Sequence, residues 1–429
     1  MIPSAKPPPQ ISSRGVEKTL CRKGIMKNFN FCVPTDIRFG RDQIECLPTE
    51  LKKLGTSVLL VYGGGSIKLT GLYQKIMALL KDDFIIYELP GITPNPRINA
   101  VRAGVRICKK NKVDVILAVG GGSCIDASKA IAAGALYDGD PWDLVLDKTK
   151  VKGALPIADV LTISATGSEM NPGAVISNEE TKEKLELNTP VLYPHLSILD
   201  PTYLFTLPKR QTAAGTADII SHVFEQYFQK GDGAFITDRL CESVLKTCFH
   251  YGPIAMAEPD NYEARSNLMW AATLGLNHIL TVGKGGAWSC HPMEHELSAF
   301  YDITHGVGLA ILTPAWMRYV LEKDPGTAAR FAMYGRNVWG IMDNKDGDEY
   351  AVGYEVDAEA ATAAAKKAIE RTADFFREMG LPSKLSEVGI GSEHFEEMAK
   401  EAVRTSGIAS RSYVPLDASD IVAIYRSCE

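Results

Sequence analysis

Histidine is rare in this chain, yet three histidines fall close together near position 300. The chain has 8 histidines in 429 residues, and His291, His295 and His305 share one short segment. A fourth, His222, follows Asp218 by four residues. Residues four apart lie on one face of a helix, so both side chains can reach a single ion. With two imidazoles from the second segment they would form a site of three histidines and one carboxylate, which suits zinc or ferrous iron.

The other histidines lack such neighbours, and a single histidine on a helix is more often packed or solvated than a ligand. We assign no chemistry to the remaining four, which are His195, His250, His278 and His394. For His295, three roles stay open on spacing alone, because it lies one turn after His291: a fifth ligand, a hydrogen-bond partner of a ligand, or a proton donor. Glu169 and Glu294 are interpreted as ordinary hydrogen-bonded residues.

Two glycine-rich turns form a second group of residues that can do chemistry. Gly63-Gly64-Gly65-Ser66 follows the apolar run SVLLVY, and Gly120-Gly121-Gly122-Ser123 follows VDVILAV. Bare glycines let the backbone approach an anion, and a helix that starts there offers free N–H groups to a pyrophosphate. Tight turns between strands and helices need glycine anyway, so for the first turn the structural and the functional interpretation are equally open. The second turn opens a helix with Asp126 in its first turn, which makes it more specific. Neither turn has the GxGxxG pattern.

The elements around the glycine turns alternate between strand and helix. Apolar, β-rich runs predict strands at 57–62, 84–89, 113–119, 160–164 and 196–199, with a short strand pair at 29–40. Helical spacing at 69–80 and 99–110 separates the first of them. Such alternation indicates a parallel sheet covered by helices on both faces.

Beyond Pro208 the apolar spacing is helical, as in 210–228, 262–277, 305–320 and 357–379. A chain of 429 residues is too long for one ordinary core, so two domains are expected. We predict a disordered leader over residues 1–25, which contain three consecutive prolines, an α/β domain over 26–207, and an all-helical domain over 208–429.

Composition limits the class of protein. The apolar share is 45%, the charged share 23% and the net charge −6, as in a globular protein without an electrostatic reason to bind nucleic acid or an anionic membrane. The nine cysteines are scattered without a pairing pattern, which indicates free thiols in a reducing compartment. No apolar run is long enough to span a bilayer and no signal peptide is visible, so we expect a cytoplasmic enzyme.

Several longer motifs resemble those of the iron-containing alcohol dehydrogenase family, and most closely its branch of butanol dehydrogenases and NADPH-dependent aldehyde reductases. They cover nearly everything from residue 26 to about residue 320. The matching stretches are FNFCVPTDIRFG (29–40), YGGGSIK (62–68), GITPNPRI (91–98), GGGSCIDASKAIAAGALYDGDPWD (120–143), LTISATGSEMNPGAVISNE (161–179), AAGTADIISHVFEQYF (213–228) and CHPMEHELSAFYDITHGVGLAI (290–311).

The resemblance implies a Rossmann-like dinucleotide-binding domain with a parallel sheet, followed by an all-α domain, in a dehydroquinate synthase-like architecture with a metal in the cleft between them. It favours proton donation as the role of His295, and we also expect a homodimer. The implied metal ligands are Asp218, His222, His291 and His305. The implied cofactor contacts are Asn95, Gly121, Gly122, Ser123, Asp126, Thr162, Thr166 and Lys184.

The resemblance further implies hydride transfer between a nicotinamide and a short-chain aldehyde or primary alcohol, such as butyraldehyde or butanol, with one Fe²⁺ or Zn²⁺ ion. Trp288, Phe300 and Tyr301 suggest an apolar substrate environment. NADP(H) is predicted over NAD(H), which stays possible, because no carboxylate follows the first strand to repel a 2′-phosphate. The groups expected to bind that phosphate are Gly63, Gly64, Gly65, Ser66 and Lys68.

Two other classes of enzyme compete with this interpretation. A cyclase of the dehydroquinate synthase kind needs Lys and Arg residues around a phosphorylated acid, and the segment 285–308 contains neither. A metallohydrolase would use the ion to activate water. The glycine turn at 120–126 would then have no purpose.

Overall fold

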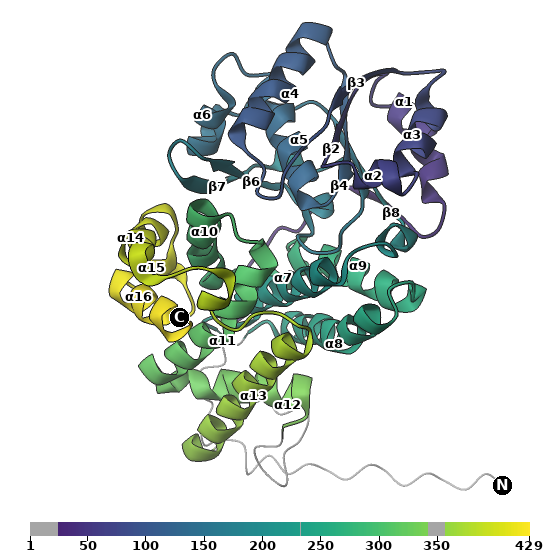
Figure 1. Ribbon diagram of the computed structural model, residues 1–429. Helices are drawn as coiled ribbons and strands as arrows, with labels where there is room; N and C mark the ends of the chain where they lie inside the picture. Colours follow the sequence, from purple (N-terminus) through teal and green to yellow (C-terminus); the bar gives the residue numbers. More distant parts are fainter. Residues whose placement is uncertain (1–24, 232, 342–356) are drawn as a thin grey trace, which may run out of the picture.

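The structure is a computed structural model that describes residues 25–231, 233–341 and 357–429. Two halves lie one above the other: a half with a sheet and helices holds the earlier part of the chain, and a helical half holds the later part (Figure 1). Of the predicted leader 1–25, residues 1–24 lie outside the described residues. The predicted domain boundary at 207/208 falls just before the first long helix of the second half, Lys209–Tyr227.

The sheet has six strands, all parallel, in the order β1-β8-β5-β4-β2-β3. The strands are β1 Asp36–Phe39, β2 Ser57–Tyr62, β3 Ile85–Leu89, β4 Val115–Gly120, β5 Ile157–Leu161 and β8 Leu196–Leu199. The parallel sheet predicted from strand–helix alternation is therefore confirmed. The strand pair predicted at 29–40 is wrong: only 36–39 is a strand, and it pairs with β8 at the sheet edge.

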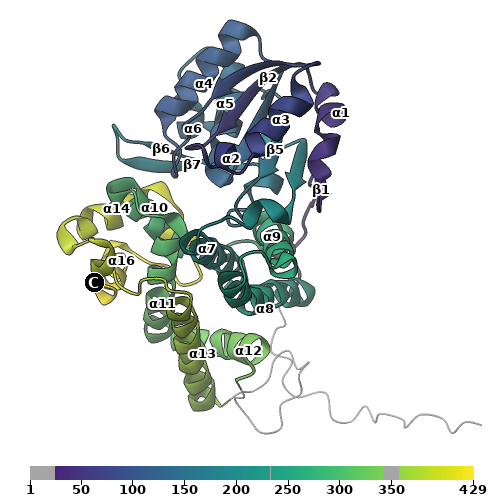
Figure 2. The same cartoon turned by 45° about the vertical axis from the view of Figure 1, so that its right-hand side comes forward.

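Helices cover both faces because alternate strand residues point in opposite directions. Val58 and Leu60 of β2 pack into the core formed with the first helices, while Leu59 and Val61 pack into the core formed with the next ones. Figure 2 shows the two helical layers on either side of the sheet. The first layer is α1 Leu47–Lys52, α2 Ser66–Leu69 and α3 Leu72–Leu80; the second is α4 Ile98–Asn111, α5 Gly122–Ala135 and α6 Pro141–Leu146.

A two-stranded antiparallel hairpin, which the sequence analysis missed, projects from this half toward the other. Its strands are β6 Gly173–Asn178 and β7 Glu183–Asn188. Strand β7 contacts helix α10, so the hairpin bridges the two halves.

The second half contains only helices within the described parts of residues 208–429, as predicted. None of the described helices is long and apolar enough to cross a membrane. The helices are α7 Lys209–Tyr227, α8 Phe235–Ala257, α9 Tyr262–Leu276, α10 Cys290–Tyr301, α11 His305–Lys323, α12 Ala328–Trp339, α13 Ala358–Glu378, α14 Phe395–Thr405, α15 Ile408–Arg411 and α16 Ala418–Ser427.

Candidate active site

The four predicted metal ligands come together from three helices of the second half. Asp218 and His222 lie on α7, His291 in the first turn of α10, and His305 at the start of α11. One donor atom from each lies within 4.8 Å of the others. The Asp218 Oδ1 atom is 3.6 Å from both His222 Nδ1 and His305 Nε2. The rings of His222 and His291 stack with their centroids 4.6 Å apart.

A close approach between two helices brings His305 to this cluster. The neighbouring residue, Gly306, lies directly against α7: a Cβ atom there would be 2.0 Å from the carbonyl oxygen of Ala214. Any side chain would therefore push α11 away from α7. Glycine at position 306 lets the first turn of α11 reach Asp218.

The cluster fits a divalent cation because three of its four side chains hold a buried donor atom without another partner. Asp218 Oδ1, His222 Nδ1 and His291 Nε2 are buried without a hydrogen bond. A buried polar atom left unpaired costs about 1–3 kcal/mol, and three of them pointing at one place indicate a missing ligand. Burial lowers the pKa of His222 and His305 well below the usual value, which keeps both imidazoles in the neutral form that binds metals. Burial also raises the pKa of Asp218 to about 7, a penalty that a bound cation would offset.

A second acidic group beside this cluster does not suit a cation. Glu294, His295 and His305 also place donor atoms close together. However, the ammonium of Lys184 lies 3.3 Å from Glu294 Oε2 and already supplies a positive charge there. A metal ion at the same place would be repelled, so the three-histidine cluster is the candidate metal centre.

His295 borders the metal centre without completing it. Its ring centroid lies 6.3 Å from that of His291 and 5.7 Å from that of His305. Burial, followed by the charge of Lys184, lowers its pKa well below the usual value, so the ring is neutral and can both accept and donate a proton. This position fits the predicted proton donor beside the substrate.

The two glycine turns lie at the same end of the sheet, where the strands reach their carboxyl ends. Strands β2 and β4 are parallel neighbours, paired from Val58↔Val115 to Tyr62↔Val119, so the turns that follow them lie side by side. The chain leaves β2 toward β3 and leaves β4 toward β5, on opposite sides of this pair. Open α/β sheets bind ligands at such a switch point, at the carboxyl ends of the strands.

Close packing also requires glycine at position 122 and leaves little room at position 121. A Cβ atom on Gly122 would lie 2.3 Å from Thr166 Oγ1, and one on Gly121 would lie 3.1 Å from Ile163 Cδ1. The loop that contains Thr162 and Thr166 is therefore pressed against the start of α5. Helix α5 begins at Gly122, with Gly121 as its N-cap, and leaves its first N–H groups for an anion.

Three other predicted cofactor contacts are engaged within the protein. Asp126 accepts hydrogen bonds from Ser168 Oγ at 2.5 Å and from the Val175 backbone at 2.9 Å. Asn95, in the left-handed backbone region at φ 51°, donates to Asp302 at 2.9 Å across the two halves. Lys184 reaches Glu294 at the metal centre. Their predicted role toward the cofactor stays a prediction.

A carboxylate that the sequence analysis missed lies near the first glycine turn. Glu88, on β3, accepts hydrogen bonds from the phenols of Tyr62 at 2.7 Å and Tyr73 at 3.0 Å. The ammonium of Lys68 lies over both rings, 5.1 and 4.6 Å from their centroids. The predicted phosphate-binding lysine is thus held beside a negative charge. Pairing of β2 with β3 creates this arrangement, and no local motif signals it.

The three residues predicted to form an apolar substrate environment do not lie together in the structure. Trp288 lies edge-on to His291 and His222, with centroid distances of 4.9 and 6.2 Å. Phe300 and Tyr301 lie at the far end of α10, where their rings contact His394. Of the three, only Trp288 forms a wall of the metal centre; the expectation for the other two is wrong because they lie more than two turns along α10.

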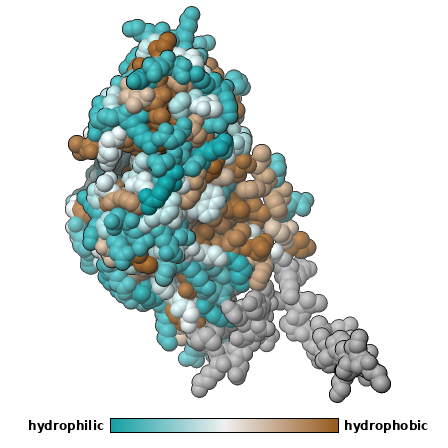
Figure 3. Space-filling view, turned by 90° about the vertical axis from the view of Figure 1, so that its right-hand side faces the viewer, coloured by the Kyte–Doolittle hydropathy of each residue, from teal (hydrophilic) through white to brown (hydrophobic). Residues whose placement is uncertain are grey.

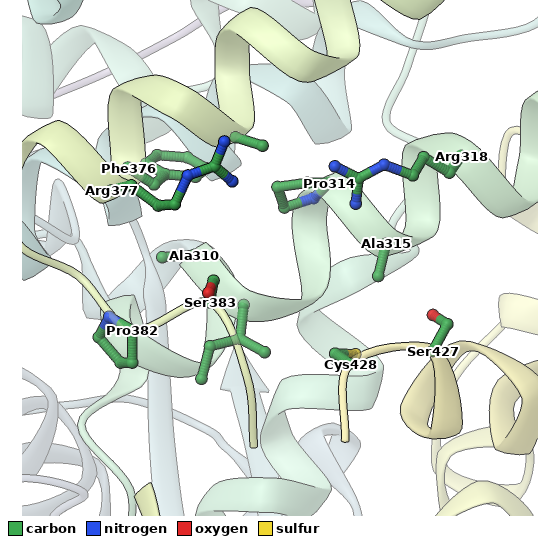
Figure 4. A pocket seen from close by; sticks show the side chains of 12 residues that line it. Ala310, Pro314, Ala315, Arg318, Phe376, Arg377, Pro382, Ser383, Ser427 and Cys428 are labelled. Carbon is green, nitrogen blue, oxygen red and sulfur yellow. The ribbon is translucent and has the colours of Figure 1, made fainter. Parts of the chain in front are cut away.

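A pocket between α11, α13 and the end of α16 lies apart from this centre (Figure 4). Its charged groups are Arg318 and Arg377, and both are paired with acids of α13: Arg318 Nε lies 2.7 Å from Glu370, and Arg377 contacts Asp374. The positive charges of both arginines are therefore already compensated within the protein.

Comparisons with known proteins match both halves of the chain. The family described as "Iron-containing alcohol dehydrogenase" matches residues 34–201, and the one described as "Fe-containing alcohol dehydrogenase family, C-terminal" matches residues 212–428.

Relatives match over nearly the whole length. NADH-dependent butanol dehydrogenase A of Clostridium acetobutylicum is 54% identical over 402 residues, which are 94% of this chain and 99% of the relative. NADPH-dependent aldehyde reductase YqhD of Escherichia coli is 38% identical over 379 residues, 88% of this chain and 93% of the relative. The crystal structure of NADH-dependent butanol dehydrogenase A from Thermotoga maritima superposes with a TM-score of 0.85 at 40% identity, covering 94% of this chain and 99% of that one.

Proposed function

The chain belongs to the iron-containing alcohol dehydrogenase family, and from this premise we propose that it interconverts short-chain aldehydes and primary alcohols, such as butyraldehyde and butanol, with a nicotinamide cofactor and one divalent metal ion. The observation that carries the proposal is the convergence of four donor side chains, of which Asp218, His222 and His291 each hold a buried donor atom without a partner within the protein. A metallohydrolase would not need a ligand site at the switch point between β2 and β4, where both glycine turns lie.

Each group of residues has a role in this reaction. Asp218, His222, His291 and His305 would hold the ion, and the turns after β2 and β4 would hold the dinucleotide. When bound, the nicotinamide supplies a hydride, and the cation stabilises the negative charge that grows on the carbonyl oxygen. Trp288 supplies an apolar wall against the alkyl chain of the substrate and excludes water from it.

His295 would complete the reaction by moving a proton. In the reducing direction the product oxygen must gain a proton, and the His295 ring borders both His291 and His305. A neutral imidazole can donate from one nitrogen and be replenished at the other.

For the cofactor, the relatives divide: those at 54% and 52% identity are named NADH-dependent, and the one at 38% is named NADPH-dependent. We propose that NADP(H) is preferred, because the Gly63–Ser66 turn offers free space at Gly64 and Gly65 and Lys68 lies nearby. Glu88 opposes this preference with its negative charge.

The cofactor proposal is tested by two variants of opposite sign. Gly63→Asp adds a negative charge near the 2′-phosphate and should lower kcat/KM for NADPH relative to NADH by about tenfold. Glu88→Gln removes a negative charge there and should raise the same ratio severalfold. Preference for NADH in the wild type, or no change of the ratio in Gly63→Asp, would contradict the proposed preference.

For the metal, we propose Fe²⁺ or Zn²⁺, since three imidazoles and one carboxylate suit both. Nitrogen and oxygen ligands bind zinc more tightly than ferrous iron, so purified protein can carry zinc whichever ion the cell uses. Metal analysis, together with activity after reloading the apoprotein with each ion, decides between them.

We further propose a homodimer in the cytoplasm. Apolar side chains gather on one face of the helical half (Figure 3). The exposed apolar residues include Phe235, Ile236 and Leu240 on α8 and Trp270 on α9, and Phe39 packs edge-on against Trp270. An apolar surface of this kind is typical of an interaction site. All eight cysteines among the described residues are free, as expected in a reducing compartment.

The proposed function is tested by following the absorbance of NADPH and NADH as butyraldehyde is added to apoprotein, to Zn²⁺-loaded protein and to Fe²⁺-loaded protein. We expect turnover only with metal and only with aldehyde. Equal turnover in the apoprotein, or none with either ion, would overturn the proposal.

A further inference from the structure

Two buried carboxylates outside the ligand set contact the imidazoles of the metal centre. Glu225 lies on α7, three residues after His222, and is 2% exposed. Glu294 lies on α10 and is fully buried. Resting on the proposed function, we propose that both are positioning residues, which fix His291 and His305 so that each ring presents its Nε2 atom to the ion.

The contacts of Glu225 fix the proton on His291. Its Oε1 atom lies 3.1 Å from His291 Nδ1 and accepts the His291 backbone N–H at 2.9 Å. Its Oε2 atom accepts the Ser289 backbone N–H at 2.7 Å. Because a carboxylate only accepts, Nδ1 must carry the proton of the neutral ring, and Nε2 is left with a free lone pair. That Nε2 atom is one of the buried atoms without a partner.

Glu225 also fixes where the ring stands. The two backbone N–H groups that it accepts belong to Ser289, the N-cap residue of α10, and to His291 in its first turn, where no residue of that helix can pair with them. One carboxylate from α7 therefore holds the start of α10 and the His291 side chain together. Helix α7 thus supplies two ligands, Asp218 and His222, and also Glu225, the group that orients a third ligand.

Glu294 contacts His305 as Glu225 contacts His291, except that a lysine also pairs with Glu294. Its Oε2 atom contacts His305 Nδ1, and its Oε1 atom accepts from Ser298 Oγ at 2.5 Å. Lys184, from β7 in the first half, lies 3.3 Å from Oε2. The same ammonium lies 3.4 Å from His305 Nδ1, but Glu294 Oε2 is the closer partner of that atom. Because a carboxylate only accepts, Nδ1 carries the proton, and His305 Nε2 faces Asp218.

The difference between the two carboxylates is their charge balance. The negative charge of Glu294 is compensated by Lys184, whereas within the described residues no lysine or arginine pairs with Glu225. Glu225 thus contributes uncompensated negative charge beside the centre as well as orientation. We expect its neutralisation to weaken metal binding more than that of Glu294.

The test measures metal affinity without reference to turnover. Zn²⁺ and Co²⁺ are titrated into apoprotein against a coloured chelator, and the Co²⁺ spectrum reports the coordination geometry. The variants are Glu225→Gln and Glu294→Gln. The matched control is Glu242→Gln, which removes a similarly buried carboxylate on α8 that accepts a hydrogen bond from Tyr227 and contacts none of the metal-site histidines.

We expect Kd for Zn²⁺ to rise about 10- to 100-fold in Glu225→Gln and by a smaller factor in Glu294→Gln, with altered Co²⁺ spectra, because carboxylates behind metal-bound histidines have effects of this size. Glu242→Gln should bind as the wild type does. Wild-type Kd and spectra in both variants would overturn the proposal, and if Glu225→Gln does not fold, the result for Glu294→Gln decides alone. A wild-type protein that binds neither ion would instead overturn the metal centre of the proposed function.

Discussion

At the candidate metal centre, the proposed function depends on side chains that converge from three helices, whereas at the carboxyl ends of β2 and β4 it depends on backbone that glycines leave bare. Buried donor atoms of Asp218, His222 and His291 have no partner within the protein and lie close to His305, an arrangement that fits an ion. Gly122 is different, because packing against Thr166 would require glycine even without a ligand.

This contrast separates two kinds of evidence. Unpaired buried donors cost stability, so three of them gathered in one place favour a bound ligand. A glycine turn costs nothing of that kind, and its function must be inferred from its position at the switch point between β2 and β4. Variants at the two places should therefore fail in different ways.

The largest effect is expected at the metal centre. His222→Ala removes one of the four donors, and turnover should fall on the order of 100-fold or more, since even residues behind metal ligands have effects of up to that size. Metal content and kcat are measured on the same preparation. Near-normal activity in metal-free His222→Ala protein would contradict the site, and His250→Ala, on helix α8, serves as the control.

A smaller loss of turnover is expected from His295→Ala, which tests whether His295 is a metal ligand or a proton donor. The variant should keep its ion, because His295 adds no donor to the four-residue cluster. Its kcat should fall about 100-fold, or its pH profile should change, since about 100-fold is the lower end of what general acid catalysis contributes. Loss of the ion from this variant would show instead that His295 is a ligand.

Much of both regions could be predicted from the sequence because the signals are local. Asp218 and His222 lie one turn apart on a helix with clear spacing, and β2 and β4 are apolar runs that end in glycine. The hairpin β6–β7 was missed because charged residues such as Lys182, Glu183 and Lys184 hide its alternation.

What the sequence could not indicate are contacts between distant segments. Glu225 was not singled out, and Glu294 was interpreted as ordinary hydrogen-bonded structure. Their roles follow from contacts with His291 and with Lys184 and His305, which depend on how α7, α10 and β7 pack. Glu88 was missed for the same reason, since its partner Tyr62 lies on the neighbouring strand. Spacing along one element does not report such pairs.

The smallest expected effect concerns the two glycine turns, where a pair of variants distinguishes a packing role from a role in cofactor binding. A Cβ atom at Gly122 would lie 2.3 Å from Thr166 Oγ1, whereas at Gly64 it would meet nothing within 4 Å. Gly122→Ala should therefore displace the 162–167 loop or the start of α5, raising KM for the nicotinamide cofactor about tenfold, since overpacking costs ~1–3 kcal/mol. Gly64→Ala should change KM little unless the cofactor itself lies against that glycine. Metal content should stay the same in both variants, because no donor of the metal centre moves. If Gly122→Ala lowers thermal stability and leaves KM unchanged, the second turn serves packing alone. If Gly64→Ala raises KM although the protein leaves room for the methyl group, the first turn contacts the dinucleotide directly.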